Sequence, residues 1–243
     1  MHPVRRDAQH WQVGIDPDAT VLLSDDPSMR ALLACVSGGD LTRGALTSAS
    51  ATAALDALSS AGLLVEPTPP RFPRPIVALV GSGPEHDQLG DLLGPDLASD
   101  EGVIDLCVIA TTAPLPRASL DGWLADGTPH LTVSGTGRPG RLRVGPFVEP
   151  GVTACVRCID AHESTSDPRR PLILEQLAVL PAGPVPPSTR ALAVAWVAHD
   201  VAAFVRGDRP STWSATIDVG GGVPERREWE RHPHCGCAWD QLY

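Results

Sequence analysis

The sequence predicts an α/β protein made of a small amino-terminal winged-helix domain and a larger, reduced Rossmann-like α/β domain with a structural zinc site. Three observations carry this prediction. Strand-like and helix-like segments alternate in the larger part, a proline-rich stretch separates two different patterns, and four cysteines stand in two close pairs. With 243 residues, of which 42% are hydrophobic, the chain is long enough for one large core or two modest ones.

Residues 1–66 have the pattern of the winged-helix domain. Its predicted elements are strands over 11–15 and 20–23, helices over 26–35, 42–47 and 51–61, and a last strand over 63–65. Asp26 followed by Pro27 is typical of a helix start, because aspartate caps the first turn and proline fits the first helical position. Gly62 predicts the end of the last helix.

A proline-rich linker is predicted between the two domains. Five of the nine residues from Pro67 to Pro75 are proline, which makes this stretch stiff and unsuited to a helix or a strand. We therefore place a domain boundary here and assign residues 76–243 to the second domain.

The second domain has the alternation of a parallel sheet covered by helices. Its predicted elements are strands over 76–80, 103–110 and 130–133, helices over 85–93 and 120–126, a half-exposed strand over 141–148, a long helix over 188–206, and strands over 214–219 and 226–230. The helix over 188–206 is apolar nearly all round, so it is expected at the centre of the core or against a partner subunit.

Four cysteines have the spacing of a tetrahedral thiolate site: Cys155 and Cys158, then Cys235 and Cys237. Each pair can supply two ligands from one loop, and four protein ligands make the site structural, with one zinc per chain. Disulfides, a redox CxxC and replacement of one sulfur by a nearby histidine are the alternatives. A redox CxxC normally opens a helix after a strand, and the pattern does not predict such a context here.

The loop Gly81-Ser82-Gly83 follows a strand and precedes a helix, which is the context of a nucleotide-phosphate turn. The third glycine of that motif is missing, and acidic residues such as Glu85 and Asp87 would repel phosphates. The sequence therefore favours a plain tight turn, and we assign no cofactor-binding residue and no catalytic residue.

Charge and missing residue types exclude several functions. All 19 basic residues are arginine, so lysine chemistry of the Schiff-base or P-loop kind is impossible in this chain. Residues 1–70 hold four arginines and eight acidic residues, which disfavours a zinc-stabilised transcriptional regulator that binds nucleic acid. The sequence has neither a signal-peptide run at its start nor a membrane-spanning stretch, and a cytoplasmic location is expected.

The stretch from Val144 to His162 resembles the "VGP-V-PG-T-C-C-D-H" region of ThiF-like proteins, and the motif from His232 to Cys237 matches the same family. These proteins accompany YcaO enzymes in the biosynthesis of azole- and azoline-containing peptides. The amino-terminal motifs Val13–Pro17 and Ala61–Leu64 resemble the peptide-recognition winged helix of these partner proteins and of PqqD.

The resemblance implies a non-catalytic partner that binds the leader of a ribosomal precursor peptide and presents it to a YcaO-type cyclodehydratase. By analogy, the leader would contact the strand near 20–23 and the helix near 51–60, through Val21, Leu22, Leu23, Leu55 and Leu58. Relatives commonly pair, which makes a homodimer through the helix over 188–206 plausible. The alternative function is an ATP-dependent ThiF-type enzyme that adenylates a carboxylate, although the incomplete glycine motif and the missing lysine speak against it.

Overall fold

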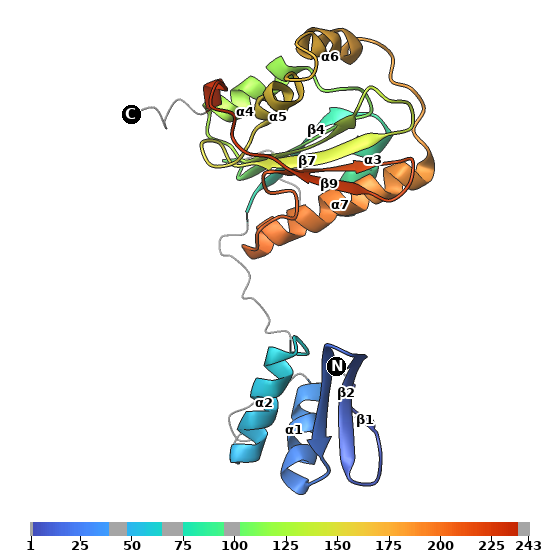
Figure 1. The fold of residues 1–243 in the computed structure, drawn as a ribbon, viewed down its shortest axis with the longest axis vertical. Coiled ribbons are helices and arrows are strands. Elements are labelled where there is room, and N and C mark those ends of the chain that lie inside the picture. The colour runs from blue at the N-terminus through green and yellow to red at the C-terminus, as the bar shows by residue number, and fades with distance from the viewer. Residues whose placement is uncertain (1, 39–47, 65–74, 95–102, 238–243) are drawn as a thin grey trace. The chain divides into compact units, whose positions relative to one another are not determined.

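The computed structural model describes residues 2–38, 48–64, 75–94 and 103–237 (Figure 1). The chain divides into two compact units, Met1–Thr68 and Pro69–Tyr243. Within the described residues, no helix combines the length and the apolar character needed to cross a bilayer.

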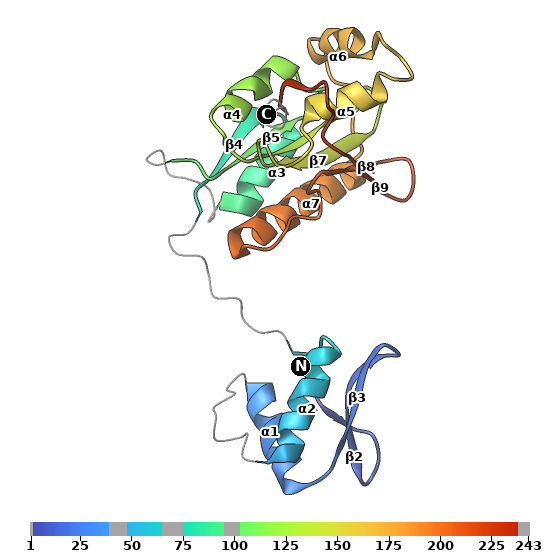
Figure 2. The ribbon, with the colours of Figure 1, turned by 60° about the vertical axis from the view of Figure 1, so that its left-hand side comes forward.

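The amino-terminal unit is a three-stranded antiparallel sheet with two helices. Its elements are β1 (Val4–Arg5), β2 (His10–Asp16), β3 (Ala19–Ser24), α1 (Pro27–Gly38) and α2 (Ala49–Ser60), with the strand order β1-β2-β3. Both helices lie on one side of the sheet (Figures 1 and 2). Leu32 and Leu58 are fully buried in the core between them and the sheet.

Side-chain caps start both helices of this unit. The Asp26 carboxylate accepts the Met29 backbone N–H at 2.9 Å, as the sequence predicted for α1, and the Ser48 hydroxyl accepts the Ala51 N–H at 3.1 Å at the start of α2. The predicted helix over 42–47 lies outside the described residues. The prediction of a strand over 63–65 is wrong for its described part, because Leu63 donates its N–H back to Leu58 of α2 instead of to a strand.

The larger unit contains a mixed six-stranded sheet of order β4-β5-β6-β7-β8-β9. Its strands are β4 (Val77–Ser82), β5 (Leu106–Thr111), β6 (His130–Gly135), β7 (Leu142–Val148), β8 (Ala215–Val219) and β9 (Glu225–Glu228). The first three are parallel, as predicted, whereas β7, β8 and β9 pair antiparallel with their neighbours. The predicted parallel pairing does not extend beyond β6, because the connection from β6 to β7, residues 136–141, is too short for a crossover.

Strand β7 is largely buried, whereas its alternation of residue types predicted a half-exposed strand. It lies between β6 and β8, and six of its seven residues are buried. Its one charged side chain, Arg143, is neutralised by Asp218 on β8, at 2.6 Å, and by Glu163, at 3.3 Å. A charge that is paired inside the fold produced the misleading polar–apolar alternation.

Helices cover both faces of this sheet (Figures 1 and 2). Helices α3 (Pro84–Leu93) and α7 (Pro187–Arg206) pack on one face, and η3 (Arg117–Leu120), α4 (Asp121–Ala125), α5 (Val156–Glu163) and α6 (Arg170–Ala178) lie over the other. The sequence predicted neither α5 nor α6. Helix α7 is one-sided rather than central: Val197 and Val201 are buried against the sheet, while Leu192 is 46% exposed.

A buried carboxylate ties α7 to the loop before β8. Asp200 accepts hydrogen bonds from the backbone N–H and the hydroxyl of Ser211, both at 2.8 Å, and from the same two groups of Thr212. The Asp200 side chain has no solvent exposure, so these four donors replace water around its charge.

We predict that Asp200→Ala lowers the free energy of unfolding of the larger unit by about 3 kcal/mol, because four buried donors lose a charged acceptor. Urea unfolding followed by near-ultraviolet circular dichroism measures this change. The matched control is Asp208→Ala, which removes only an exposed ion pair with Arg206 and should change the free energy by less than about 0.5 kcal/mol. Equal effects of the two substitutions would contradict the structural role of Asp200.

Candidate metal centre

The first cysteine pair lies at the start of α5, directly after the turn that follows β7. Glu149 and Thr153 close this turn: the Glu149 carbonyl accepts the Thr153 N–H at 3.0 Å, and the Glu149 N–H donates to the Thr153 hydroxyl at 2.8 Å. Cys155 is then the N-cap residue of α5, and Cys158 lies one helical turn later. A helix start therefore places both sulfur atoms on the same side.

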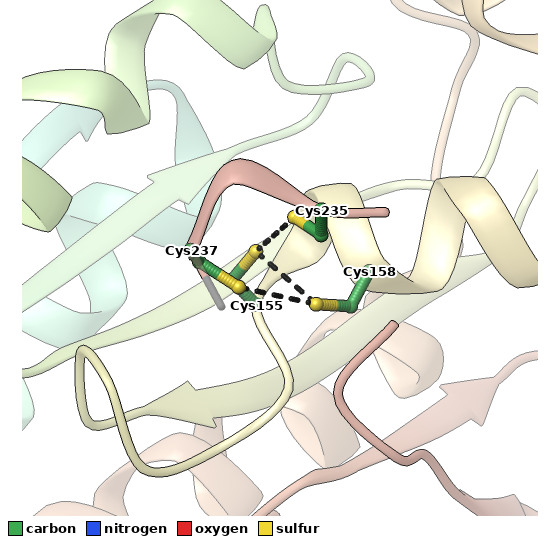
Figure 3. A group of neighbouring side chains, drawn as sticks. All are labelled: Cys155, Cys158, Cys235 and Cys237. Atoms are coloured by element: carbon green, nitrogen blue, oxygen red, sulfur yellow. Dashed lines mark hydrogen bonds between the residues drawn. The ribbon is translucent and has the colours of Figure 1, made fainter. Parts of the chain in front are cut away.

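The second pair comes from the segment after β9 and meets the first (Figure 3). The sulfur of Cys155 lies 3.7 Å from that of Cys158 and 3.6 Å from that of Cys235, and the sulfurs of Cys158 and Cys237 are 3.3 Å apart. All four sulfurs lie within 4.8 Å of one another. Cys155, Cys158 and Cys235 are buried, and Cys237 is half-buried. The structure thus brings together the four predicted ligands.

The geometry and chemistry of this cluster fit a metal ion. Four sulfurs at the corners of a tetrahedron with metal–sulfur bonds of about 2.3 Å are separated by about 3.8 Å, close to the separations observed here. In the bare cluster, hydrogen bonding to Cys155 lowers the pKa of Cys158, while hydrogen bonding to Cys158 raises the pKa of Cys155. Four thiolates cannot share this buried space without a cation, so the cluster could hold a metal ion and is compatible with zinc.

The structure argues against the three alternatives to a metal site with four sulfur ligands. No two of the six cysteines are bonded. His232 accepts the His234 N–H on Nδ1 at 3.2 Å, and neither imidazole joins the four-sulfur group. We expected that the first cysteine pair would not begin a helix after a strand, as a redox CxxC does. This expectation is wrong, because Cys155 begins α5 after β7. What argues against that alternative is the presence of two further sulfurs at contact distance.

The remaining cysteines lie apart from this centre. Cys107 is fully buried in β5, where burial raises the pKa of its thiol to about 12, and Cys35 is half-buried in α1. A cleft of about 470 Å³ opens beside Cys155 and Cys235, with Asp121 and Arg157 on its walls. These two side chains are already paired with each other at 2.8 Å.

The glycine loop after β4 is occupied by a side chain of the protein itself. A Cβ atom at Gly81 would lie 1.9 Å from the Ala110 carbonyl oxygen, so close approach to β5 requires glycine there. Glu85, in the first turn of α3, is fully buried; its carboxylate accepts the Thr112 hydroxyl at 2.5 Å and the Arg190 Nε–H at 2.9 Å. The sequence indicated the acidic residue but not Arg190, which is 105 residues away.

The five predicted peptide-contacting residues lie in the amino-terminal unit, in two environments. Leu23 and Leu58 are buried in its core, with 6% and 0% exposure. Leu22 is 50% exposed on β3, and Val21 and Leu55 are half-buried beside the core.

The structure therefore defines an α/β protein of two units with a candidate four-cysteine metal centre in the larger one. No protein-family model and no curated protein matches the sequence. Solved structures do share the fold. A heterocyclase in complex with substrate and cofactor has a TM-score of 0.66 at 15% identity, over 99% of this chain and 39% of its own.

The heterocyclase TruD gives the same TM-score and identity, with 99% of this chain and 42% of that chain covered. The microcin C7 biosynthetic enzyme MccB, in complex with N-formylated MccA, has a TM-score of 0.60 at 11% identity, over 98% of this chain and 97% of its own. This chain spans about two fifths of the length of the heterocyclase chains. At such low identities, the similarity establishes a common fold.

We predict that the purified protein contains about one zinc ion per chain, and that Cys158→Ser lowers this content severalfold, because three sulfurs hold the ion less tightly than four. Inductively coupled plasma mass spectrometry measures the content. Cys107→Ser is the control, since this thiol lies outside the cluster. A wild-type protein that is folded without metal would contradict the prediction.

Proposed function

We propose that this protein is a non-catalytic, leader-peptide-binding partner that presents a ribosomal precursor peptide to a YcaO-type cyclodehydratase in azole or azoline biosynthesis. The observation that carries the proposal is a fold shared with a heterocyclase that was solved with substrate and cofactor, and with the microcin C7 biosynthetic enzyme MccB, which was solved with N-formylated MccA. The sequence resemblance to ThiF-like partner proteins points the same way. The heterocyclase chains are longer, and this chain matches about two fifths of their length.

The open edge of β3 supports peptide capture. Strand β3 ends the sheet order β1-β2-β3, and its register pairs Leu23 with Trp11 and Leu22 with Gln12. The Asp25 N–H donates to the Gln9 carbonyl at 2.7 Å, and alternate residues of an antiparallel strand face the same neighbour. Leu23 therefore faces β2, and Leu22 directs its N–H and C=O outward, where an extended peptide can add a strand.

Burial reduces the number of predicted side chains that a leader peptide could contact. We assign the contact to Leu22, with Val21 and Leu55 at its margin, and to Leu23 and Leu58 only a supporting role inside the core. The half-exposed leucine on an open edge offers both backbone hydrogen bonds and an apolar side chain to the peptide.

The larger unit would act as a scaffold with a structural zinc ion. Glu85 and Arg190 fill the position in which a nucleotide-binding turn would hold phosphate, and a buried carboxylate repels a phosphate group. Four protein sulfurs leave no coordination position for water on the metal. Pairing of two copies through α7 remains part of the proposal, and its exposed Leu192 is available for it.

The second candidate function is an ATP-dependent ThiF-type enzyme that adenylates a carboxylate. The likeness to MccB, which extends over 97% of that chain, favours it. The absence of lysine from the sequence and the internal Glu85–Arg190 pair argue against it.

We predict that Leu22→Asp weakens leader binding at least tenfold, because it places a charge beside the added strand. The probe is a fluorescein-labelled synthetic leader of a ribosomal precursor peptide, and fluorescence anisotropy measures its binding. The control is Ile15→Asp on β2, where the side chain is 86% exposed and lies off the β3 edge. Unchanged affinity of the Leu22 variant, or equal losses in both variants, would refute the assigned surface.

We also predict that isothermal titration with ATP and magnesium gives no binding at micromolar concentration, because the buried Glu85 carboxylate at the start of α3 would repel a phosphate group. Pyrophosphate exchange in the presence of a carboxylate substrate is the companion assay. Exchange above background would establish the adenylating function instead.

A further inference from the structure

A second candidate site lies at the opposite end of the larger unit's sheet from β4, beside the edge strand β9. A groove of about 570 Å³ runs along the end of this strand, lined by Arg209, Ser211, Trp213, Ser214, Arg226 and Glu228. None of these residues belongs to the metal cluster or to the proposed leader surface. Two tryptophans, Trp213 and the buried Trp229, line the groove together with charged residues of both signs.

Strand β9 offers backbone hydrogen bonds to this groove. It ends the described sheet, pairing only with β8. The Trp229 N–H donates to the Ser214 carbonyl at 2.8 Å, so Trp229 and the alternate residue Arg227 face β8. Arg226 and Glu228 therefore direct their N–H and C=O groups away from the sheet, at the spacing that an added strand requires.

An arginine that forms no ion pair among the described residues lies in the groove. Its charge acts on Glu228, whose pKa is lowered by the hydrogen bond with Arg226 and, more weakly, by Arg209. The Arg209 guanidinium stands 5.2 Å from the centre of the Trp213 ring, and this ring stacks with Phe147 at 5.7 Å. Among the described residues, no carboxylate lies within ion-pair distance of Arg209, whereas Arg226 is paired with Glu228 at 2.6 Å. Arg209 is thus a preoriented cation on an aromatic surface, suited to a carboxylate.

The backbone at the base of the groove is held in an unusual conformation. Ser214 has a φ of +47°, and it is the one described residue other than glycine with a positive φ. Its hydroxyl accepts the Ala154 N–H at 2.9 Å and its carbonyl accepts the Trp229 N–H. These bonds fix the shape of the groove in the absence of a ligand, which favours binding.

A second copy of the chain gains little from the charges of β9, which reads Glu-Arg-Arg-Glu from Glu225 to Glu228. Only registers that place outward residues opposite each other can form hydrogen bonds between two such strands. The register that pairs Arg226 with Glu228 also places Arg227 opposite its own copy, and like charges directly opposite each other destabilise a strand pair.

We propose that this groove and the β9 edge bind an extended acidic segment of another polypeptide. The segment adds as a strand along the outward groups of Arg226 and Glu228, and one of its carboxylates pairs with Arg209. This site is separate from the proposed leader surface in the amino-terminal unit and does not depend on it.

The test uses the full chain and a fluorescein-labelled octapeptide of alternating threonine and valine with one central glutamate, measured by fluorescence anisotropy. We expect saturable binding, a loss of at least fivefold when glutamine replaces the glutamate, and a similar loss when the peptide backbone is N-methylated. In the protein, Arg209→Gln should reproduce the first loss. Arg206→Gln, whose exposed side chain pairs with Asp208, should retain the affinity.

Glu228→Pro removes one outward N–H and should also weaken binding at least fivefold, in protein whose metal content is unchanged. Unaltered binding by Arg209→Gln or to the N-methylated peptide would overturn the proposal. So would a dimer in analytical ultracentrifugation that Glu228→Pro dissociates, since it would identify a second copy as the occupant. Leu22→Asp should leave octapeptide binding intact; its loss would place the probe in the amino-terminal unit and refute this site alone.

Discussion

Convergence of four sulfur atoms is the constraint on which the larger unit depends. Cys155 and Cys235 are 80 residues apart, and Cys158 and Cys237 are 79 apart, so the cluster closes a loop that contains α6, α7, β8 and β9. Closing a loop of this length costs chain entropy, and burying several thiolates costs electrostatic energy. A cation would offset both costs at once and would couple metal binding to the folding of this unit.

The four-cysteine cluster and the β9 groove share a structural support. Ser214 bonds Ala154, the residue before Cys155, and also Trp229, which packs in the hydrophobic cluster around the sulfurs. On the other side of the same loop, Asp200 holds Ser211 and Thr212. The wall of the groove is therefore anchored to the cysteine segment and to α7, and its shape follows from interactions that stabilise the fold.

The sequence predicted the features that depend on neighbouring residues. It did not predict the features that depend on a partner far away in the sequence. The cysteine spacing, the Asp26 cap and the apolar pattern of α7 are local, and each has its counterpart in the structure. The burial of β7 was missed because Arg143 is neutralised by Asp218, 75 residues away. Helices α5 and α6 were missed because their short apolar stripes are interrupted by charges that pair across the fold, such as Arg117 with Asp160.

The edges of β3 and β9 differ in a way that bears on their roles. An unpaired edge invites aggregation unless charge protects it, and β9 has this protection because its outward residues, Arg226 and Glu228, are both charged. Strand β3 lacks it: its outward residue Leu22 is apolar and half-exposed. An apolar edge is costly to leave in water and is covered when a peptide adds to it. An apolar peptide segment would thus suit the β3 edge, and the proposed acidic segment would suit the β9 edge.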